Sequence, residues 1–384
     1  MSLMLHYKPN PMKISIITPT NNVQFLKELE ETIMGQSYGN WEWVILLNQG
    51  ASYSAADQRI KIVECPFVND SVGFLKRLAC MNATGDVIAE VDHDDLLTKD
   101  CLAKVAAAFA SDDEVGFVFS QNAKLADNFR PYMPEYGWTH SMFRWSKRNL
   151  YAMHNQPVTP GRLGHIWFAP DHIRCWRKDV YESIGGHDDS LKVCDDLDLM
   201  HRLYLATRFK EIPEVLYIYR ITGNNTYVQR GKAIRELNDV IYNKNIVALS
   251  RRYAEINGLD VIYLHRGQDL SSLEDNSAGL IVANDVLQYI QDKTQFMQTV
   301  HRILAPGGML LCETPSTDGR GAFQDPEAIS FWNENAFWYF TKREFAAKIR
   351  SKVLFRESKN ATEYRDDFGR EHKVPYVIAH LEKV

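Results

Sequence analysis

Residues 86–95 read Asp-Val-Ile-Ala-Glu-Val-Asp-His-Asp-Asp, an apolar, partly β-branched run that passes directly into three carboxylates. A run of this kind predicts a short buried strand, and the acidic group follows where that strand ends. Open α/β sheets bind their ligands beside the carboxyl ends of their strands. We therefore expect Asp92, Asp94 and Asp95 at a ligand-binding edge of a sheet.

Stretches on either side repeat this pattern. Further strands are predicted at 13–20, 41–47 and 59–63, with helical periodicity in the segments between them. Strands that alternate with helices indicate an α/β fold with a parallel sheet that helices cover on both faces. Between residues 120 and 170 the periodicity is lost in an aromatic, proline-containing stretch, which we interpret as a functional loop.

The length of 384 residues suggests two or three domains. We place a first domain at 12–228, a polar, amphipathic linker helix at 229–258, and a second, smaller α/β unit at 259–384. The second unit is expected from apolar runs that begin near Asp260 and Ala278, with a helix after them.

Composition and charge exclude several classes of protein. Hydrophobic residues make up 45% of the chain and charged residues 24%, as in ordinary folded domains, which excludes largely disordered and fibrous proteins. The formal net charge of -5 offers no basic field for a phosphate backbone, so nucleic acid is not an expected partner. Six cysteines without a CxxC pair predict reduced, mostly buried thiols. No apolar run approaches the ~18 residues of a membrane span, so we expect a cytoplasmic protein that at most contacts the inner membrane face peripherally.

The acidic group at 92–95 points to a divalent cation. Carboxylates packed this closely repel one another, and a cation removes that repulsion. Mg²⁺ and Mn²⁺ are commonly held by one or two carboxylates together with substrate phosphates. The alternative interpretation is a solvated turn that ends the strand and caps the next helix.

Three segments carry a resemblance to a known family. They are ISIITPTNN at 14–22, VGFLKRLACMNATGDVIAEVDHDDLL at 72–97, and GHDDSLKVCDDLDLMHRL at 186–203. Their order and spacing over about 12–228 resemble the glycosyltransferases of family 2, which have the GT-A fold. The resemblance implies a Rossmann-like α/β domain that binds a nucleoside-diphosphate sugar.

The resemblance also implies a nucleotide site. In the family, the end of the first strand, the turn after the second strand and a basic residue reach the nucleotide. The matching positions are Thr18, Pro19, Thr20, Asn48 and either Lys76 or Arg77. Asn48 stands where the family usually has an acidic residue; an amide still forms hydrogen bonds but carries no charge. We expect a UDP-sugar, with a GDP-sugar as the alternative.

Catalytic and metal-binding roles follow from the same resemblance. Asp92 is expected to contact the ribose or the metal, and Asp94 to coordinate the Mn²⁺ or Mg²⁺ that bridges the diphosphate. Asp196 matches the general base that deprotonates the acceptor hydroxyl, and Asp195 replaces the usual glutamate before it. Asp95 is expected to support the turn.

Two departures concern further ligands. The histidine that often follows the strand after the base helix is absent, and Thr222-Gly223-Asn224 stand in its place, which removes one metal or phosphate ligand. His165 is a candidate for the site from the irregular stretch, with an ordinary loop histidine as the alternative. Aromatic residues that could stack on a sugar, or only pack, are Trp138, Trp145, Tyr151, Trp167 and Trp176.

The C-terminal unit resembles the later half of class I S-adenosylmethionine-dependent methyltransferases, on the segments 279–290 and 301–308. A complete domain of that class begins with a strand and a glycine-rich turn that cradles the cofactor. No GxGxG stands between Arg230 and Asp260. We therefore expect a truncated methyltransferase-like unit without S-adenosylmethionine, which serves as a lid, an acceptor platform or a homodimer contact.

The sequence thus predicts a metal-dependent, inverting glycosyltransferase that acts on a glycan or glycolipid acceptor in polysaccharide biosynthesis. Two alternatives stay open. The C-terminal half could be an active methyltransferase that modifies the same glycan, or the whole chain could bind sugar nucleotides or glycans without catalysis. The acids at 92, 94 and 196 argue against the last alternative, because binding alone needs no general base.

Overall fold

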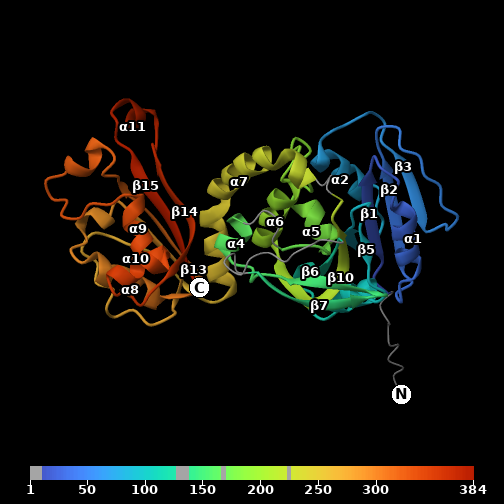
Figure 1. Cartoon of the computed structure of the whole chain (residues 1–384), viewed down its shortest axis with the longest axis horizontal. Coiled ribbons are helices and arrows are strands. Elements are labelled where there is room, and N and C mark those ends of the chain that lie inside the picture. The colour runs from blue at the N-terminus through green and yellow to red at the C-terminus, as the bar shows by residue number, and fades with distance from the viewer. Residues whose placement is uncertain (1–10, 127–137, 166–169, 223–225) are drawn as a thin grey trace, which may run out of the picture. The chain divides into compact units, whose positions relative to one another are not determined.

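The computed structural model describes residues 11–126, 138–165, 170–222 and 226–384 (Figure 1). Internal contacts divide the chain into two compact units. The first unit comprises residues 1–156 and 167–241, and the second comprises residues 157–166 and 242–384. The segment 157–166 therefore packs with the second unit, although parts of the first unit flank it in the sequence.

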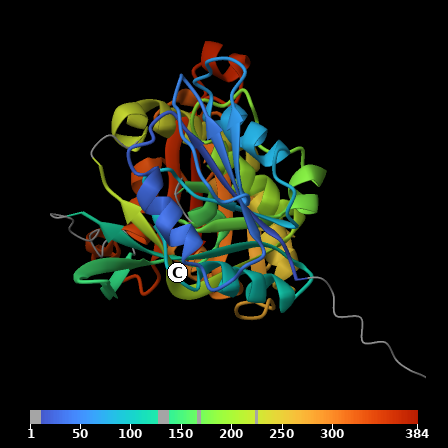
Figure 2. The ribbon, with the colours of Figure 1, turned by 90° about the vertical axis from the view of Figure 1, so that its right-hand side faces the viewer.

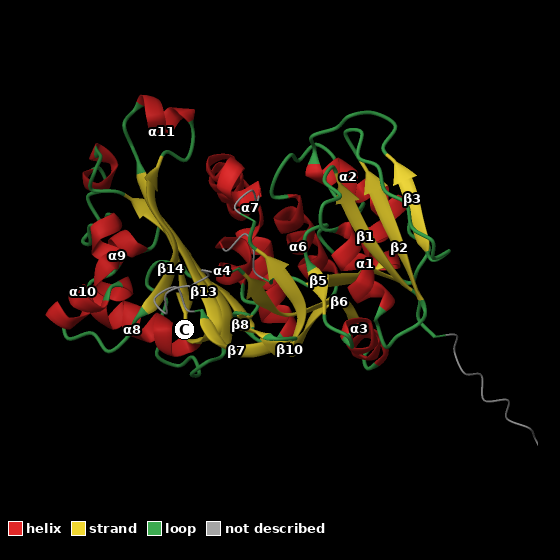
Figure 3. Ribbon diagram, turned by 45° about the vertical axis from the view of Figure 1, so that its right-hand side comes forward, coloured by secondary structure: helices red, strands yellow, loops and turns green. Residues whose placement is uncertain are grey.

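The first unit is built on one mixed β-sheet. Among the described residues its strand order is β3-β2-β1-β4-β9-β6-β10-β5, with a hairpin of β7 and β8 attached to β6. The parallel strands β1, β2 and β3 lie side by side (Figure 2, Figure 3), whereas β9 runs antiparallel to both β4 and β6. The strands are β1 (Ile14–Thr20), β2 (Trp41–Leu47), β3 (Ile60–Glu64), β4 (Val87–Glu90), β5 (Leu96–Leu97), β6 (Val115–Leu125), β7 (Thr139–Trp145), β8 (Arg148–His154), β9 (Arg174–Arg177) and β10 (Arg208–Arg220).

Helices cover both faces of this sheet because its central strands are apolar on both sides. Ile16, Trp43 and Ala89 share one buried cluster with residues of α1 and α3. The alternate residues Ile17 and Val44 are also fully buried, and α2 packs on β1 and β2. This two-sided burial confirms the predicted α/β class. The helices are α1 (Leu26–Met34), α2 (Val72–Met81), α3 (Cys101–Ala110), α5 (Lys178–Ser183), α6 (Asp195–Ala206) and α7 (Thr226–Ile256), which is shared with the second unit.

The stretch between residues 120 and 170 contains more regular structure than predicted. β7 and β8 form an antiparallel hairpin, and β8 pairs with the end of β6. β7 is exposed or half-buried along its whole length, so its sequence lacks the alternation of apolar and polar residues that marks a strand. The prediction of an irregular loop is therefore wrong for this hairpin.

The second unit contains a five-stranded sheet whose order, among its described residues, is β11-β12-β13-β15-β14. Helices α8 and α9 bury Val300 and Phe337 against one face. The last part of α7 packs Tyr242 and Ile246 against residues such as Leu280 on the other face. The elements are α4 (Pro160–His165), β11 (Asp260–Tyr263), β12 (Ala278–Asn284), η2 (Leu287–Tyr289), α8 (Lys293–Ile303), β13 (Leu304–Pro315), η3 (Arg320–Phe323), α9 (Glu334–Thr341), α10 (Arg343–Lys348), β14 (Phe355–Glu363), α11 (Asp367–Glu371) and β15 (Tyr376–Lys383).

Two expectations about the whole chain can be compared with these elements. In the part of the chain that the structure describes, no helix is both long enough and apolar enough to cross a membrane. All six cysteines are free thiols; Cys65 is half-buried and the other five are buried. The prediction of reduced, mostly buried cysteines is confirmed.

Candidate active site

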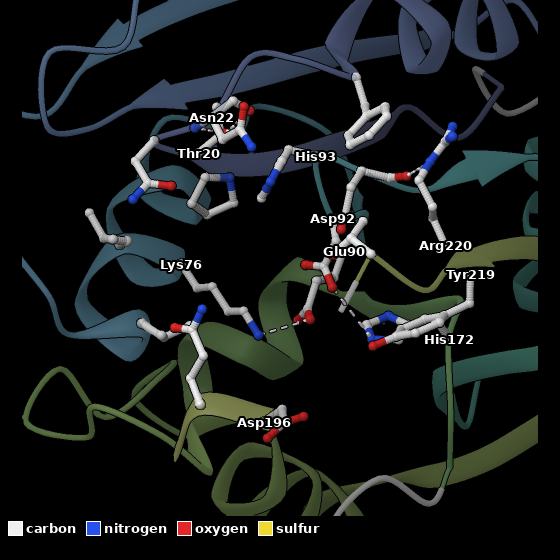
Figure 4. A pocket seen from close by; sticks show the side chains of 18 of the residues that line it. Thr20, Asn22, Lys76, Glu90, Asp92, His93, His172, Asp196, Tyr219 and Arg220 are labelled. Atoms are coloured by element: carbon white, nitrogen blue, oxygen red, sulfur yellow. Dashed lines mark hydrogen bonds and ion pairs between the residues drawn. The ribbon is translucent and has the colours of Figure 1, made fainter. Parts of the chain in front are cut away.

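A pocket of about 960 Å³ lies at the carboxyl edge of the first unit's sheet, where β1, β2 and β4 end (Figure 4). Its walls also include the start of α2, the start of α6 and the end of β10. The pocket therefore collects segments that are distant in the sequence at the predicted binding edge. The predicted site residues that line it are Pro19, Thr20, Asn48, Lys76, Asp92, Asp94 and Asp196.

Thr18 is the exception among the predicted residues. Its side chain is fully buried, its hydroxyl donates a hydrogen bond to the Val91 carbonyl at 2.9 Å, and it accepts one from the Trp43 indole at 2.9 Å. Thr18 thus ties the end of β1 to the residue after β4. Both contacts lie inside the sheet and Thr18 is not among the pocket residues, so the predicted part of this position in nucleotide binding stays a prediction.

Asn48 lines the pocket, but its amide is engaged with the backbone. Its Nδ2 donates to the Asn69 carbonyl at 2.8 Å, and its Oδ1 accepts from the Asn69 amide at 3.4 Å. Asn69 and Asp70 also line the pocket, in the loop that leads into α2. Asn48 therefore fixes part of the pocket wall.

Lys76 lies in the pocket wall between two carboxylates. Its ammonium group is 2.9 Å from Glu90 Oε1 and 3.2 Å from Asp195 Oδ2, and all three side chains are buried. Burial opposes the charged form, but Asp195 and Glu90 outweigh it and raise the pKa of Lys76 well above its usual range. Lys76 is a fixed positive charge in the pocket wall, and its predicted contact with the nucleobase stays a prediction.

Asp92 and Asp94 project from the turn after β4. The Asp92 side chain is 42% exposed, and Asp94 is half-buried. Burial and the neighbouring Asp92 raise the pKa of Asp94. Asp95 is buried and accepts hydrogen bonds from the Tyr217 hydroxyl at 2.7 Å and the Arg220 amide at 2.6 Å. These bonds confirm that Asp95 supports the turn.

Asp196 lies in the first turn of α6, where the helix dipole favours a carboxylate. The residue before this helix, Cys194, has a φ of 57°, which is unusual for a residue other than glycine. Arg174 Nη1 donates to Asp196 Oδ2 at 2.7 Å. Burial disfavours ionisation of Asp196, but Arg174 and Lys76 outweigh it and lower the pKa of this carboxyl.

Asp195 has a different environment from its neighbour. Burial, only partly offset by Lys76, raises the pKa of Asp195 to about 6. Two adjacent carboxyls therefore differ in charge state in mildly acidic solution. Asp196 is the one that stays ionised.

Sequence reasoning missed His172 and Arg174. His172 lines the pocket, and Arg174 begins β9 opposite Glu90 of β4. β9 is only four residues long and lies antiparallel between two strands that are remote from it in sequence. The signal that could have found them is a pair of basic side chains beside the apolar residues Ile173 and Cys175.

Four of the five aromatic candidates for sugar stacking lie in the described residues, and these four do not line this pocket. Of the residues that the structure describes, neither Trp138, Trp145, Tyr151 nor Trp176 lines it. Trp176 is buried and instead stacks on Tyr181, with ring centroids 5.7 Å apart. Trp167 and the side chain of His165 lie outside the described residues.

The carboxylate oxygens in the pocket fit a divalent cation whose remaining ligands come from a bound substrate. No set of three or more His, Cys, Asp and Glu side chains within the described ranges could hold a metal ion by itself. Asp92 and Asp94 nevertheless place two carboxyl groups beside the pocket. Mg²⁺ and Mn²⁺ need only one or two carboxylates when phosphates complete the coordination.

Two parts of the sequence match known protein families. Residues 15–169 match the family described as glycosyl transferase family 2. The first unit thus contains a segment similar to the family 2 glycosyltransferases. Residues 223–312 match a second family, described as a methyltransferase domain. The predicted GT-A fold and the predicted methyltransferase-like unit after this glycosyltransferase domain are both confirmed.

Curated relatives of the chain are distant and much longer. An O-antigen biosynthesis protein, RfbC of Myxococcus xanthus, is 23% identical over 268 residues, which is 63% of this chain and 18% of that protein. An uncharacterized protein, y4gI of Sinorhizobium fredii, is 22% identical over 230 residues, 54% of this chain and 22% of that protein. The chain thus spans about a fifth of the length of these relatives.

Solved structures similar to the chain include glycosyltransferases. TarS 1–349 of S. aureus in complex with UDP-GlcNAc is 17% identical, with a TM-score of 0.43 over 64% of this chain and 73% of that one. The mannosyltransferase PcManGT of Pyrobaculum calidifontis, in complex with GDP-Man and Mn²⁺, is 16% identical, with a TM-score of 0.40 over 65% of this chain and 76% of that one.

The methyltransferase-like unit does not fit S-adenosylmethionine. Before β11 the chain forms the long helix α7, where a complete domain has a strand and a glycine-rich turn. At the carboxyl ends of β12 and β13, Asp285 and Glu313 both bind Arg365, at 2.9 and 2.6 Å. The residues present provide no cradle for the cofactor, so we derive no methyl transfer in this unit.

Proposed function

We propose that the chain is an inverting glycosyltransferase, which transfers a sugar from a nucleoside-diphosphate sugar to a hydroxyl group of a glycan or glycolipid. The observation that carries the proposal is the meeting of Asp92, Asp94 and Asp196 in one pocket at the carboxyl edge of the sheet. Its volume of about 960 Å³ lies in the range of pockets that enclose small ligands. The match of residues 15–169 to glycosyltransferase family 2 supports the same activity.

The nucleotide is proposed to lie against the ends of β1 and β2. Pro19, Thr20 and Asn48 form this wall, together with neighbouring amide side chains such as Asn21 and Gln49. Amides offer both donors and acceptors to a base or a ribose without adding charge. We propose a UDP-sugar as the donor, with a GDP-sugar as the alternative.

Asp92 and Asp94 are proposed to hold a divalent cation together with the diphosphate. When bound, Mn²⁺ or Mg²⁺ would stabilise the negative charge of the departing nucleoside diphosphate. The two carboxylates that would hold this cation lie just after β4 and line the same pocket as the proposed nucleotide wall.

Asp196 is proposed as the general base. The acceptor oxygen forms a bond to the anomeric carbon while the bond from that carbon to the diphosphate oxygen breaks. The nucleoside diphosphate leaves, and the acceptor proton passes to the Asp196 carboxylate. Attack from the side opposite the leaving group inverts the configuration. Arg174 keeps Asp196 ionised and oriented before the acceptor binds.

Calorimetric titration tests the proposal. UDP-sugars and GDP-sugars are titrated into the wild-type protein and the Asp94→Asn variant, with and without Mn²⁺. We expect one nucleotide sugar to bind the wild type in a Mn²⁺-dependent manner, and this dependence to vanish in Asp94→Asn. Lack of binding by every nucleotide sugar would contradict the proposal.

A further inference from the structure

Two phenylalanine side chains are exposed together on the second unit. Phe323 is 63% exposed and Phe331 is 41% exposed, and their rings stack with centroids 5.2 Å apart. Ile329, which is 60% exposed, lies two residues before Phe331. Large apolar side chains that gather on a surface commonly mark a binding site. We call these three residues the aromatic platform.

The loop that carries the aromatic platform, residues 316–333, is held in place at several points. Its two ends are joined where the Thr317 amide donates to the Trp332 carbonyl at 2.9 Å. The Trp332 indole is buried and donates to the Leu287 carbonyl at 3.0 Å. Lys293 donates to the carbonyl of Phe331 itself. A ligand would therefore meet rings that are already positioned, and would not have to order the loop.

The aromatic platform belongs to the carboxyl edge of the second unit's sheet. Its loop follows β13, and the connections after the parallel strands β11 and β12 reach it. Arg266, after β11, places its guanidinium carbon 4.2 Å from the ring centroid of Tyr289, in η2 after β12. The Tyr289 hydroxyl donates to Asp325, and Arg266 pairs with Glu327, both in the loop after β13. Open α/β sheets bind ligands at this edge, so the three connections form one candidate binding surface.

The polar groups of this surface both donate and accept hydrogen bonds. Asp325 and Glu327, which accept, lie between Phe323 and Ile329 in the sequence, and Arg266 and Tyr289 supply donors beside them. A sugar ring matches such a surface. One of its faces carries C–H groups that pack on an aromatic ring, and the hydroxyl groups around it donate and accept hydrogen bonds.

We propose that the aromatic platform is a second, non-catalytic binding site for a neutral saccharide of the glycan acceptor. This inference rests on the proposed function, because the proposed reaction supplies the glycan. It assigns a ligand to a unit that has no cradle for S-adenosylmethionine. The site binds through ring stacking and hydrogen bonds to hydroxyl groups, without any chemical step.

Charge and size distinguish this ligand from other partners. An anionic membrane is attracted by clusters of lysine and arginine, whereas the carboxylates of Asp325 and Glu327 lie among the exposed rings. The three side chains of the platform also offer much less than the ~800 Å² per partner that a standard protein interface buries. A single saccharide is therefore the partner that this surface fits best.

The test compares four forms of the full chain. The double variant Phe323→Ala/Phe331→Ala removes both rings and retains Trp332, which anchors the loop. Phe323→Tyr keeps a ring at the more exposed position. Tyr263→Ala is the matched control, because Tyr263 is 43% exposed in the same unit but its hydroxyl is bound by Arg251 of α7. The wild type completes the set.

Binding is measured by native electrophoresis in gels that contain dextran, mannan or hydroxyethyl cellulose. We expect at least one of these polysaccharides to slow the wild type. Its dissociation constant should rise at least about tenfold in the double variant, and stay within about twofold in Phe323→Tyr and Tyr263→Ala. If the double variant fails to fold, Phe323→Ala decides the question, since this ring is mostly exposed.

Four results would overturn the inference. They are the absence of retardation by all three polysaccharides, equal retardation of all four proteins, sedimentation with phosphatidylglycerol vesicles that depends on the two rings, and a dimer in light scattering that the double variant loses. The third result would assign the platform to a lipid surface, and the fourth to a second copy of the chain. Calorimetric binding of nucleotide sugars tests the pocket of the first unit separately, so failure of either proposal leaves the other measurable.

Discussion

The Arg174 guanidinium donates a 2.7 Å hydrogen bond to the carboxylate of Asp196, so a residue of β9 holds the first turn of α6. Both groups lie deep in the site: the Arg174 side chain is 3% exposed and that of Asp196 is 21% exposed. Burial alone would raise the pKa of this carboxyl, and Arg174 with Lys76 lowers it below its usual value instead. The proposed base is thus ready to accept a proton at neutral pH.

Arg174→Met should move the acid limb of the pH profile to higher pH. In the wild type the pKa of Asp196 lies below its usual value, so turnover should not fall on account of this group until the solution is strongly acidic. Without Arg174, burial raises that pKa, and the unprotonated base is lost at a higher pH. The measurement is kcat/KM against pH, with the nucleotide sugar identified by calorimetry.

Arg174→Lys is the matched control for this change. It retains a positive charge near Asp196, so its acid limb should lie between those of the wild type and Arg174→Met. An acid limb at the same pH in all three proteins would show that Arg174 does not tune the base.

Lys76→Met should destabilise the first unit. The substitution leaves the buried carboxylates of Glu90 and Asp195 without their shared cation. Loss of one partner of a buried ion pair costs about 3–5 kcal/mol in the free energy of unfolding. Adding Glu90→Gln to Lys76→Met should recover at least about 1 kcal/mol, because it removes one of the uncompensated charges. The measurement is urea unfolding.

A surface lysine provides the comparison. Lys27 pairs with Glu30 at 2.9 Å, but its side chain is 71% exposed. Lys27→Met should change the free energy of unfolding by no more than about 1 kcal/mol. If Lys76→Met and Lys27→Met lower the free energy of unfolding equally, the buried ion pairs of Lys76 contribute no more to stability than a surface ion pair.

The residues that sequence reasoning placed correctly lie in strongly patterned segments. The run before Asp92 is apolar except for Glu90 because β4 is buried on both sides, and this pattern is visible without a structure. The pattern was equally clear at the turn that Asp94 occupies and in the helix whose first turn contains Asp196. The burial of the Thr18 side chain inside the sheet could not be predicted, because a position next to a binding edge does not reveal whether its side chain points into the pocket or into the sheet.

His172 and Arg174 could not be found in this way. Arg174 begins, and His172 shortly precedes, a four-residue strand whose partners, β4 and β6, are remote in sequence, and the position of this strand in the sheet is a tertiary property. β7 was missed for a related reason, because an exposed strand has no apolar face to set a period of two. The functional contacts that escaped prediction thus depend on pairing between distant segments.

S-adenosylmethionine should not stabilise the protein. The carboxyl edge of the second unit's sheet carries the Arg365 ion pairs with Asp285 and Glu313, and the glycine-rich turn is absent from the segment before β11. A ligand at a hundred times its dissociation constant adds about 2.7 kcal/mol to the free energy of unfolding, which a thermal shift assay detects. We expect an unchanged Tm with S-adenosylmethionine; a saturable increase would show that the second unit retains this cofactor.

The most direct test of the account is release of nucleoside diphosphate from a nucleotide sugar by Asp196→Asn. Asp198 lies on the same helix, binds Arg202 at 2.6 Å and is not among the described residues of the pocket wall, so Asp198→Asn makes the same change of charge outside the site. We predict that Asp196→Asn lowers kcat by about 10²–10⁴-fold, with donor binding within a few-fold of the wild type, and that Asp198→Asn turns over at a rate close to that of the wild type. Turnover by Asp196→Asn within tenfold of the wild type would contradict the central claim that this carboxylate is the base of a glycosyl transfer.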